Sequence, residues 1–392
     1  MDALNAFMKY MKYLSFLSSP LGLNVFASEY RTGIRTYISY LVLIVYVILT
    51  VNSIIIATEG TDILKALSFG GFFFQCALKI YFTLSRSELY YQNHEQLKKY
   101  IYLRHLNGDE KQKAVVLKNI TLLLNLVKVT TVLYLSTILL FSAYPVYMYV
   151  FEKTVITMFP LYIPGVSTES ILGYWMTNSF HILFAIYGLF GALASDTAFM
   201  MFIFHIVSYT ELFAIEFDKF AEDLTLIQND ADSKNHSDFC HTQMRQIISS
   251  HQEILAYLKS LQVCYENICK TQVGTTVMTL SFNLFLALVT DWYATYGFAT
   301  ASLFQMFIYS VLGTIMQLMN ERVMGMIYDF PWHLLTNSER RSFTFLLRRS
   351  QLFIEMHIRG FGPLNMEAFT EIMRLIYSSF TMLYSFLTEQ EL

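Results

Sequence analysis

Charged residues and prolines are scarce in this chain of 392 residues: 15% are Asp, Glu, Lys or Arg, and only 6 are proline. Soluble domains carry about 25% charged residues, so the deficit argues against a soluble globular protein. The formal net charge of -3 and the lack of basic runs interleaved with aromatics exclude a nucleic-acid partner. Instead 55% of the residues are hydrophobic and 16% are aromatic. This composition is typical of a protein embedded in the lipid bilayer.

Sequence signatures of catalysis are also missing. The chain has no GxSxG, HExxH or P-loop motif and no paired carboxylates at a useful spacing on an apolar segment. Inverted repeats of the transporter type are not visible either. We therefore expect neither an enzyme nor a cofactor.

The 4 cysteines cannot tie outer loops together, because Cys76 lies in an apolar run and Cys240, Cys264 and Cys269 lie in segments expected in the cytoplasm. Reduced thiols are the expected state there. Cys240 beside His241 does not complete a four-ligand set, and neither does Cys264 with Cys269. No metal site is predicted.

Seven runs approach the roughly 20 apolar residues that a helix needs to cross the hydrocarbon core. They predict an all-α membrane protein with seven transmembrane helices. The runs are Tyr37–Ala57, Ile63–Leu84, Ile120–Val146, Trp175–Ser195, Val273–Asp291, Tyr296–Met319 and Phe369–Leu387. The fourth run is expected to continue as helix to about Ile215.

Lys and Arg alternate between the connecting segments, which predicts the threading of the chain. They are frequent before the first span and in segments 86–118, 215–270 and 320–366, and almost absent from the other connections. Because positively charged loops stay in the cytoplasm, the N-terminus is predicted inside and the C-terminus outside. The first 20 residues predict a short amphipathic helix on the inner membrane face, and the long inner segments predict a cytoplasmic layer of helices.

An arginine-rich stretch precedes the last span. Thr336 followed by Glu339 predicts a capping box, and apolar residues from Phe343 to Met356 recur at helical spacing. Two interpretations stay open: an amphipathic helix with a solvated arginine face, or a helix that packs in the cytoplasmic layer or on a neighbouring subunit.

Polar residues in the last span share one helix face. They follow at steps of 4, 3, 4 and 3 residues: Arg374, Ser378, Thr381, Ser385 and Thr388. The stripe predicts either ordinary helix packing or a water-lined conduction path, which would need several subunits to enclose it.

Charged residues inside spans are costly and raise a suspicion of function. Lys79 and Lys128 are expected to reach the interface by snorkelling. Asp196 is expected to pair with Lys128 or Arg374, or to lie where the fourth span leaves the lipid.

Aromatic and small polar residues in the outer halves of spans two to six predict a pocket for a small apolar molecule with one or two hydrogen-bonding groups. Ordinary helix packing is the alternative. The candidates are Phe69, Phe72, Phe73, Phe74, Thr137, Phe141, Tyr144, Trp175, Asn178, His181, Phe282, Phe285 and Phe298.

The C-terminal third contains four short motifs: PWH at Pro331 to His333, ERR at Glu339 to Arg341, GFGPLNMEAF at Gly360 to Phe369 and a final YSSFTMLYSFL. With these motifs it resembles the insect odorant receptors. DTAFMMFIFHIVSYTELF, from Asp196 to Phe213, also fits that family. The resemblance covers the whole chain by topology and is specific from about Asp196 onward.

This resemblance implies an odorant-gated, non-selective cation channel subunit that forms a heterotetramer with a shared co-receptor in the plasma membrane of sensory dendrites. Residues 1–320 would hold six spans and the odorant pocket, 321–365 a cytoplasmic anchor, and 366–392 the pore helix with a gate near Ser385, Leu387 and Thr388. The anchor would include Trp332, His333, Arg340, Arg341 and Phe353.

Arg374 departs from a symmetric cation pore, because its charge near the inner mouth opposes cations. This favours the odour-tuning subunit over the shared one, which by resemblance carries an extra inner loop. A metabotropic seven-span receptor and a gustatory-receptor-type channel remain as alternatives; the inverted charge bias and the lack of Asp-Arg-Tyr and NPxxY motifs argue against the first.

Overall fold

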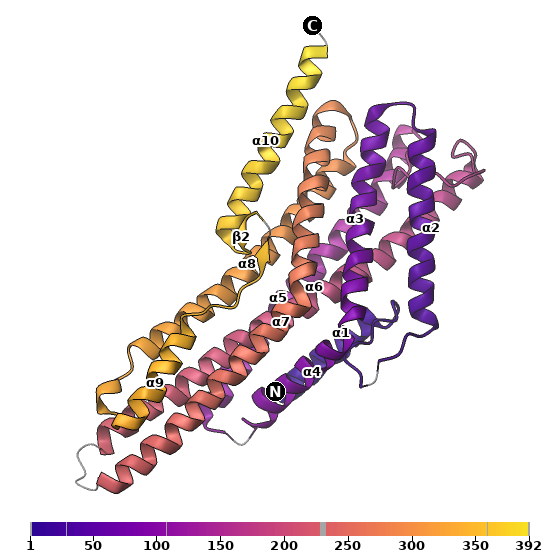
Figure 1. Ribbon diagram of the computed structural model, residues 1–392. Coiled ribbons are helices and arrows are strands. Elements are labelled where there is room, and N and C mark those ends of the chain that lie inside the picture. Colours follow the sequence, from indigo (N-terminus) through magenta and orange to yellow (C-terminus); the bar gives the residue numbers. More distant parts are fainter. Residues whose placement is uncertain (1, 29, 107, 228–232, 359, 391–392) are drawn as a thin grey trace.

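The computed structural model describes residues 2–28, 30–106, 108–227, 233–358 and 360–390, without the side chains of residues 233–235, 383 and 386–390. The described chain is almost entirely helical (Figure 1), which confirms the prediction of an all-α protein. The helices are α1 (Ala3–Ser18), α2 (Ile34–Ile56), α3 (Gly60–Ser85), α4 (Ser87–Leu97), α5 (Glu110–Tyr147), α6 (Ile171–Ile227), α7 (Ser233–Val289), α8 (Ala294–Tyr328), α9 (Asn337–Ser350) and α10 (Met366–Gln390). Short helical turns η1 (Lys98–Leu103), η2 (Met148–Glu152) and η3 (Trp332–Leu334) and the strands β1 (His357–Ile358) and β2 (Gly362–Pro363) complete the described elements.

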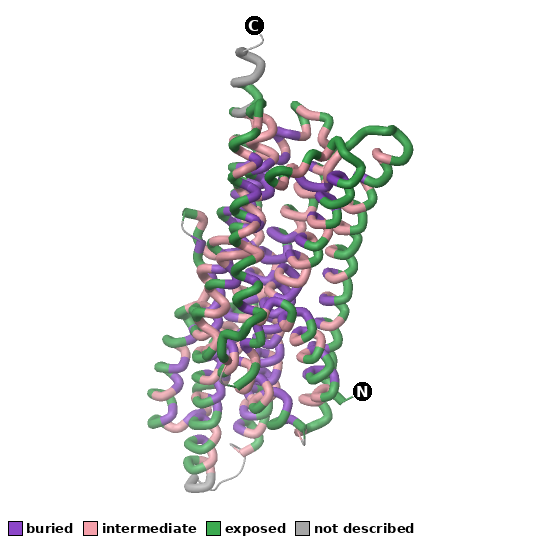
Figure 2. Tube along the Cα trace, turned by 90° about the vertical axis from the view of Figure 1, so that its right-hand side faces the viewer, coloured by how far each residue is buried: buried purple, intermediate pink, exposed green. Residues whose placement is uncertain are grey.

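Six of the described helices are long and apolar enough to cross a membrane: α2, α3, α5 with η2, α6, α7 and α8. Each coincides with a predicted span. The seventh predicted span forms α10, which is a continuous helix but is not one of these six, so the count of seven and the orientation stay predictions. The two termini lie toward opposite ends of the molecule (Figures 1 and 2). We call the end that carries the C-terminus the outer end and the end that carries α9 the inner end.

The longest described helices are α6 and α7, each of 57 residues. Both continue from the outer end to the inner end, where they lie beside α9 (Figure 1). We call these inner parts of α6 and α7, together with α9, the inner arm. The described parts of the inner segment 215–270 are therefore extensions of α6 and α7, whereas segment 86–118 also holds α4 and η1. The middle of α6 is the centre of the main core: Phe199 to Ile203 are all buried, including the faces that a surface helix would expose. Figure 2 shows that buried residues concentrate in the middle of the molecule and that exposed residues lie mostly on its outside.

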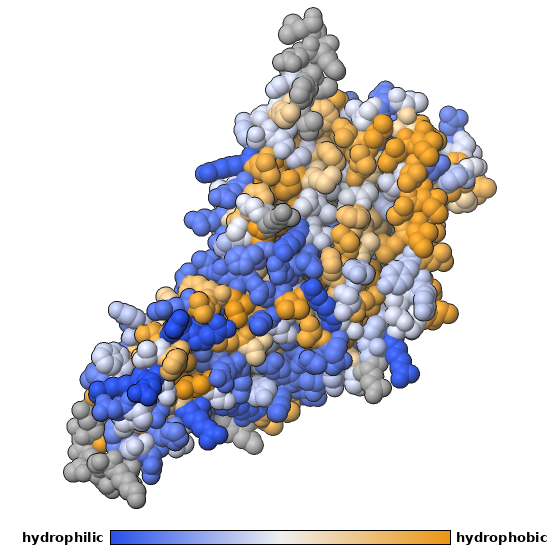
Figure 3. Space-filling view, in the orientation of Figure 1, coloured by the Kyte–Doolittle hydropathy of each residue, from blue (hydrophilic) through white to orange (hydrophobic). Residues whose placement is uncertain are grey.

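The exposed face of α2 is apolar, and its buried face is mostly polar. Its exposed residues include Ile34, Leu41 and Ile55, whereas Ser39 and Ser53 are buried against the protein. Ser39 donates to the carbonyl of Leu21 at 2.7 Å and Ser53 to that of Leu49 at 2.8 Å. Figure 3 shows an apolar surface over the outer part of the molecule and a hydrophilic one over the inner arm. This distribution is what lipid contact demands, because lipid cannot satisfy polar groups.

α1 confirms the predicted N-terminal helix, but its apolar face packs on protein. Phe7, Tyr10 and Leu14 are buried in the main core, and the Tyr10 hydroxyl donates to the carbonyl of Thr197 in α6 at 2.6 Å. The exposed face of α1 carries Lys9 and Lys12.

The arginine-rich helix α9 begins after Thr336 as predicted, but the capping box is wrong. The Thr336 side chain makes no capping bond to the helix. The Glu339 carboxylate is buried and accepts instead from Ser338 at 3.3 Å and lies 3.2 Å from Nδ1 of His241 in α7. The predicted helical pattern to Met356 also runs past the end of the helix, because α9 stops at Ser350 and the chain enters the β1–β2 hairpin.

The hairpin delivers α10 onto α8. The backbone N–H of Met366 donates to Thr314 Oγ1 at 3.0 Å, and Asn365 donates to Gln317 Oε1 at 3.0 Å. Gly313 lies so close that a Cβ atom there would collide with the carbonyl of Leu364. The start of the last helix is therefore fixed to the inner half of α8.

Candidate functional site

A cleft of about 570 Å³ lies at the outer end between α5, α8 and the loop of residues 153–170. We call this cavity the outer cleft and the loop the outer loop. The lining of the outer cleft combines apolar and aromatic side chains with a few hydroxyls. This composition is typical of small-molecule sites. The lining residues are Thr137, Leu140, Phe141, Ala143, Tyr144, Pro145, Tyr147, Ile156, Thr157, Met158, Trp292, Tyr293, Ala294, Tyr296, Gly297 and Thr300.

Three predicted pocket residues line this cleft: Thr137, Phe141 and Tyr144. Their steps of 4 and 3 residues place them on one face of α5. α8 can approach this face because residue 297 is glycine: a Cβ atom there would lie 2.8 Å from the Phe141 ring. The close approach sets the floor of the cleft.

Phe69 and Phe298 pack behind this floor. The Phe298 ring lies 4.2 Å from Phe141 and 4.3 Å from Phe69 between ring centroids. Phe69 also contacts Phe159 of the outer loop at 4.4 Å. These two residues support the cleft without lining it.

The remaining predicted aromatics are placed elsewhere. Phe73 stacks on Tyr46 at 3.5 Å and contacts Phe72 and Phe184, in the same hydrophobic cluster as Phe69 and Phe159. None of the others lines the outer cleft: Phe74 and Trp175 are exposed, Phe282 is half-buried and Phe285 is buried.

Asn178 and His181 hold the outer loop. The backbone N–H of Met158 donates to Asn178 Oδ1 at 2.8 Å, and that of Phe159 donates to His181 Nδ1 at 3.3 Å. His181 Nε2 lies 3.0 Å from the carbonyl of Leu161. Both side chains are buried, so their polar atoms satisfy loop backbone groups that burial would otherwise leave unpaired.

Sequence reasoning missed the loop and the α7–α8 connection as cleft walls. Thr157 and Met158 come from the loop, and Trp292 and Tyr293 from the connection. On α8, the four-residue step from Tyr296 to Thr300 repeats the helical spacing seen on α5. That spacing was the available signal, but only tertiary packing shows that the two faces meet.

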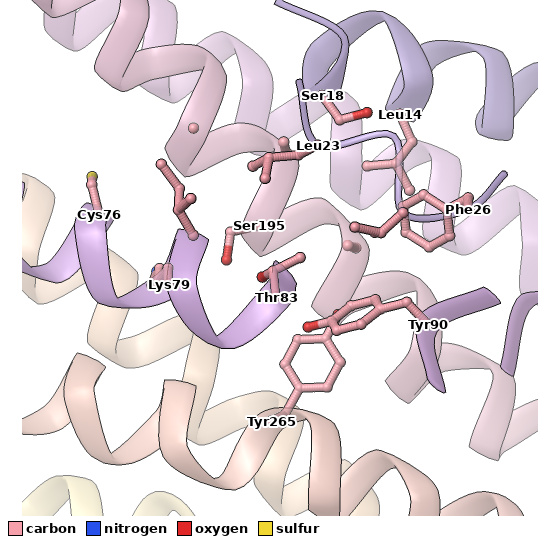
Figure 4. A pocket seen from close by; sticks show the side chains of 15 residues that line it. Leu14, Ser18, Leu23, Phe26, Cys76, Lys79, Thr83, Tyr90, Ser195 and Tyr265 are labelled. Atoms are coloured by element: carbon pink, nitrogen blue, oxygen red, sulfur yellow. The ribbon is translucent and has the colours of Figure 1, made fainter. Parts of the chain in front are cut away.

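A second cavity lies deeper in the protein and has a volume of about 40 Å³. Figure 4 shows Cys76, Lys79 and Thr83 of α3 beside Ser195 of α6 at this cavity. Small-molecule sites occupy about 300–1,000 Å³, so this cavity of about 40 Å³ is too small to be one, whereas the outer cleft lies within that range.

Asp196 is the centre of a buried polar network that joins five helices. Its Oδ1 atom lies 2.9 Å from Lys79 Nζ and accepts from the Tyr309 hydroxyl at 2.8 Å. Its Oδ2 atom accepts from Tyr134 at 2.6 Å and from Gln305 Nε2 at 2.8 Å. Gln305 Oε1 in turn accepts from Gln272 of α7 at 2.9 Å. We call these six residues the polar hub.

Two predictions about charges are thereby corrected. Lys79 does not snorkel, because it is buried against Asp196, and Asp196 pairs with neither Lys128 nor Arg374, whose side chains are exposed. Because α3 packs against α6, the cation that pairs with Asp196 is Lys79 and not Lys128 or Arg374. The carboxylate thus has four donors, one of which is the neutralising ammonium of Lys79, so neither charge is buried without a partner.

The polar stripe of the last span lies on the exposed side of α10. Arg374, Ser378 and Ser385 are exposed, whereas Ile372 and Ile376 are buried against the bundle. Thr381 donates to the carbonyl of Ser378 at 2.9 Å and Ser385 to that of Thr381 at 2.8 Å. The side chains of Leu387 and Thr388 lie outside the described residues.

The predicted anchor residues lie at the inner end. Trp332, His333, Arg340 and Arg341 are exposed, and Phe353 is half-buried. Arg340 donates to the carbonyl of His333 at 2.5 Å, which ties η3 to α9. Their part in holding subunits together stays a prediction.

Fold and site define a helical membrane protein with several candidate spans and a ligand-sized cleft at one end. A family model described as "7tm Odorant receptor" matches residues 59–377, and the chain belongs to this family of sensory receptors. The match confirms the resemblance seen in the C-terminal third, and an enzymatic role is set aside with it.

Individual relatives agree with this assignment. A curated relative, "Putative odorant receptor 83c" from Drosophila melanogaster, is 23% identical over 379 residues that cover 92% of this chain and 93% of the relative. The solved structure of the insect olfactory receptor OR5 from Machilis hrabei in complex with eugenol has a TM-score of 0.74 at 13% identity, covering 96% of this chain and 99% of that one. A further structure of the same receptor has a TM-score of 0.72 at 13% identity, covering 97% of this chain and 99% of that one. At this identity the structural likeness shows the fold.

Proposed function

We propose that this chain is the odour-tuning subunit of an odorant-gated, non-selective cation channel, a heterotetramer with a shared co-receptor in the plasma membrane of sensory dendrites. The observation that carries the proposal is the outer cleft of about 570 Å³. It has the size of ordinary small-molecule sites. OR5, with which this chain shares its fold, binds eugenol.

The hydroxyls in the cleft indicate the class of odorant. Thr137 donates to the carbonyl of Leu133 at 2.9 Å, and Thr300 donates to that of Tyr296 at 2.7 Å. Because each threonine has already used its only hydrogen, its oxygen can only accept, whereas the Tyr144 phenol can also donate. A small aromatic or medium-chain molecule with one hydroxyl, ester or ketone group fits this arrangement.

The polar hub offers a connection from the cleft to the last helix. Tyr134 lies three residues before Thr137 on α5, and Gln305 lies five residues after Thr300 on α8. Both donate to Asp196. Further along α8, Gly313 and Thr314 contact the start of α10. A ligand that shifts α8 in the cleft would therefore also shift the seat of α10.

The exposed stripe of α10 supports a pore shared between subunits. A single helix cannot enclose a channel, and its polar groups need water or partner helices inside a membrane. Four such helices around one axis would line a hydrated path. Arg374 lies at the inner end of this stripe, where the partner subunits would have to offset its charge.

Whole-cell current tests the proposal in cells that express this chain with or without an insect co-receptor, with no GTP in the pipette. The probes are eugenol, 1-octanol, ethyl hexanoate and 2-heptanone. A fast odour-evoked cation current that requires both chains is the expected result. Second-messenger responses without such a current would overturn the channel proposal in favour of the metabotropic alternative.

A further inference from the structure

We infer that odorants reach the outer cleft sideways from the lipid bilayer, through the seam between α5 and α8, rather than from the aqueous side through the outer loop. The inference rests on the proposed odorant site. Two independent features of the cleft carry it: the outer loop closes one side, and an apolar, exposed rim forms the other.

The outer loop is fastened at several points and buries its own apolar residues. Met158, Phe159 and Leu161 are buried, and Asn178 and His181 bind their backbone. Farther along, the backbone N–H of Tyr162 donates to Ser53 Oγ at 2.9 Å. Opening this side would expose apolar surface and break buried hydrogen bonds, both of which are unfavourable.

The seam side carries no such cover within the described chain. Leu140 on α5 is 73% exposed, and Tyr147 and Tyr296 at the same rim are also exposed. All three line the cleft. Leu140 and Tyr296 lie on predicted spans and Tyr147 directly follows one, and their exposure matches that of the outward residues of α2. The rim therefore faces the hydrocarbon region or its border.

The seam also presents little polar resistance to an apolar molecule. The hydroxyls of Thr137 and Thr300 donate to carbonyls of their own helices, so neither donates across the seam between α5 and α8. Apolar volatiles concentrate in the bilayer because transfer of apolar surface out of water is favourable. A lateral opening takes odorants from that concentrated phase.

Two tryptophan substitutions on neighbouring residues test the route. Leu140→Trp adds bulk at the rim, whereas Leu139→Trp adds the same bulk at a residue of similar exposure, 69%, that does not line the cleft. With eugenol, 1-octanol, ethyl hexanoate and 2-heptanone as probes, L140W is expected to slow the rise of the current by about threefold or more, because access limits association. L139W is expected to retain the wild-type rise. Equal rise times in the two variants would overturn the inference.

A locked loop tests the competing route. Cysteines at Ser53 and Tyr162 would cross-link the outer loop to α2, and reduction would release it. Under lateral access the rise time is the same before and after reduction. A slow rise that reduction restores would show that odorants pass through the loop, and the inference would be wrong.

A measurement without odorant separates failure of the route from failure of the proposed function. In a W175F/W332F variant the only tryptophan is Trp292, which lines the cleft. In nanodiscs made from lipids with brominated acyl chains, the fluorescence of Trp292 is expected to be quenched. Absence of quenching would mean that the seam is covered, for example by a partner subunit, and would overturn lateral access even if odour-evoked currents are observed.

Discussion

The ammonium of Lys79 lies 2.9 Å from Oδ1 of Asp196, and the two side chains are only 5% and 2% exposed. Their residues are 117 positions apart in the chain. Tyr134, Gln305 and Tyr309 are further donors to the same carboxylate. The pair therefore connects α3 and α6 to α5 and α8, which form the outer cleft, and α8 also carries the start of α10.

Removing one member of this pair should destabilise the protein strongly. Asp196→Asn leaves a buried ammonium without its counter-ion, which costs about 3–5 kcal/mol and lowers the midpoint of thermal unfolding in nanodiscs. Asp62→Asn is the matched control. Asp62 pairs with Lys65 at 2.8 Å, both on α3, and the Asp62 side chain is exposed. Exposed ion pairs contribute about 0–1 kcal/mol. Equal shifts for the two variants would contradict the role of the hub. The double variant K79M/D196N should recover part of the loss.

Gly313→Ala should disturb the seat of α10. Its Cβ atom would collide with the carbonyl of Leu364, and overpacking of this kind costs about 1–3 kcal/mol. We expect a smaller odour-evoked current at equal surface expression, measured by patch clamp and surface biotinylation. Gly325→Ala on the same helix meets no atom within 4 Å and should preserve the current. A normal current in G313A would show that this contact does not position the pore helix.

Thr137→Met should weaken odorant binding, because the longer side chain occupies the outer cleft. A methylene group is worth about 1–3 kcal/mol in such pockets, so the half-maximal odorant concentration should rise about tenfold in dose-response curves. Thr121→Met is the control: Thr121 is an exposed residue of α5 that donates to the carbonyl of Leu117 at 2.7 Å and lies outside the cleft. If T121M shifts the curve as much as T137M, the cleft is not the binding site.

Asn178→Ala should loosen the outer loop. It removes the acceptor for the buried N–H of Met158, and an unsatisfied buried donor costs about 1–3 kcal/mol. Hydrogen exchange of residues 153–170, followed by mass spectrometry, should accelerate. Asn52→Ala removes an exposed bond to the same loop, at 3.0 Å from the carbonyl of Tyr162, and should have a smaller effect. Unchanged exchange in N178A would mean that other contacts hold the loop.

Arg374→Gln should increase cation conductance through the assembled channel, because it removes a positive charge from the predicted inner mouth. Single-channel recording with the co-receptor measures the change. Arg348→Gln removes the same charge from α9, away from α10, and should leave conductance unaltered. The same conductance in R374Q and the wild type would place Arg374 away from the ion path.

Features that depend on local spacing were predictable. The positions of the helices follow from the length and hydropathy of each run, and the exposed stripe of α10 follows from steps of three and four residues. The capping box failed although its spacing was correct, because Glu339 finds His241 across the packed inner arm. A motif of four residues cannot report on such a distant competitor.

Residue type and position brought together only part of the residues that line the outer cleft. Thr137, Phe141 and Tyr144, chosen from the sequence on one face of α5, line this cavity, and their role in binding stays a prediction. Asn178 and His181 have the same polar character, but the outer loop folds back on them and takes their hydrogen bonds. The composition of the sequence does not predict these hydrogen bonds, because it does not show which groups lie next to a polar atom in the folded protein.

The sequence by itself determined that the protein is an all-helical membrane protein of the odorant receptor type, because hydropathy, helical period and short motifs are properties of contiguous residues. Only the tertiary structure decided that Asp196 pairs with Lys79, that Gly297 admits α8 to the face of α5, and that the outer loop covers the cleft. These relationships join segments far apart in the chain, and their energies depend on which helices pack together once the apolar surfaces are buried.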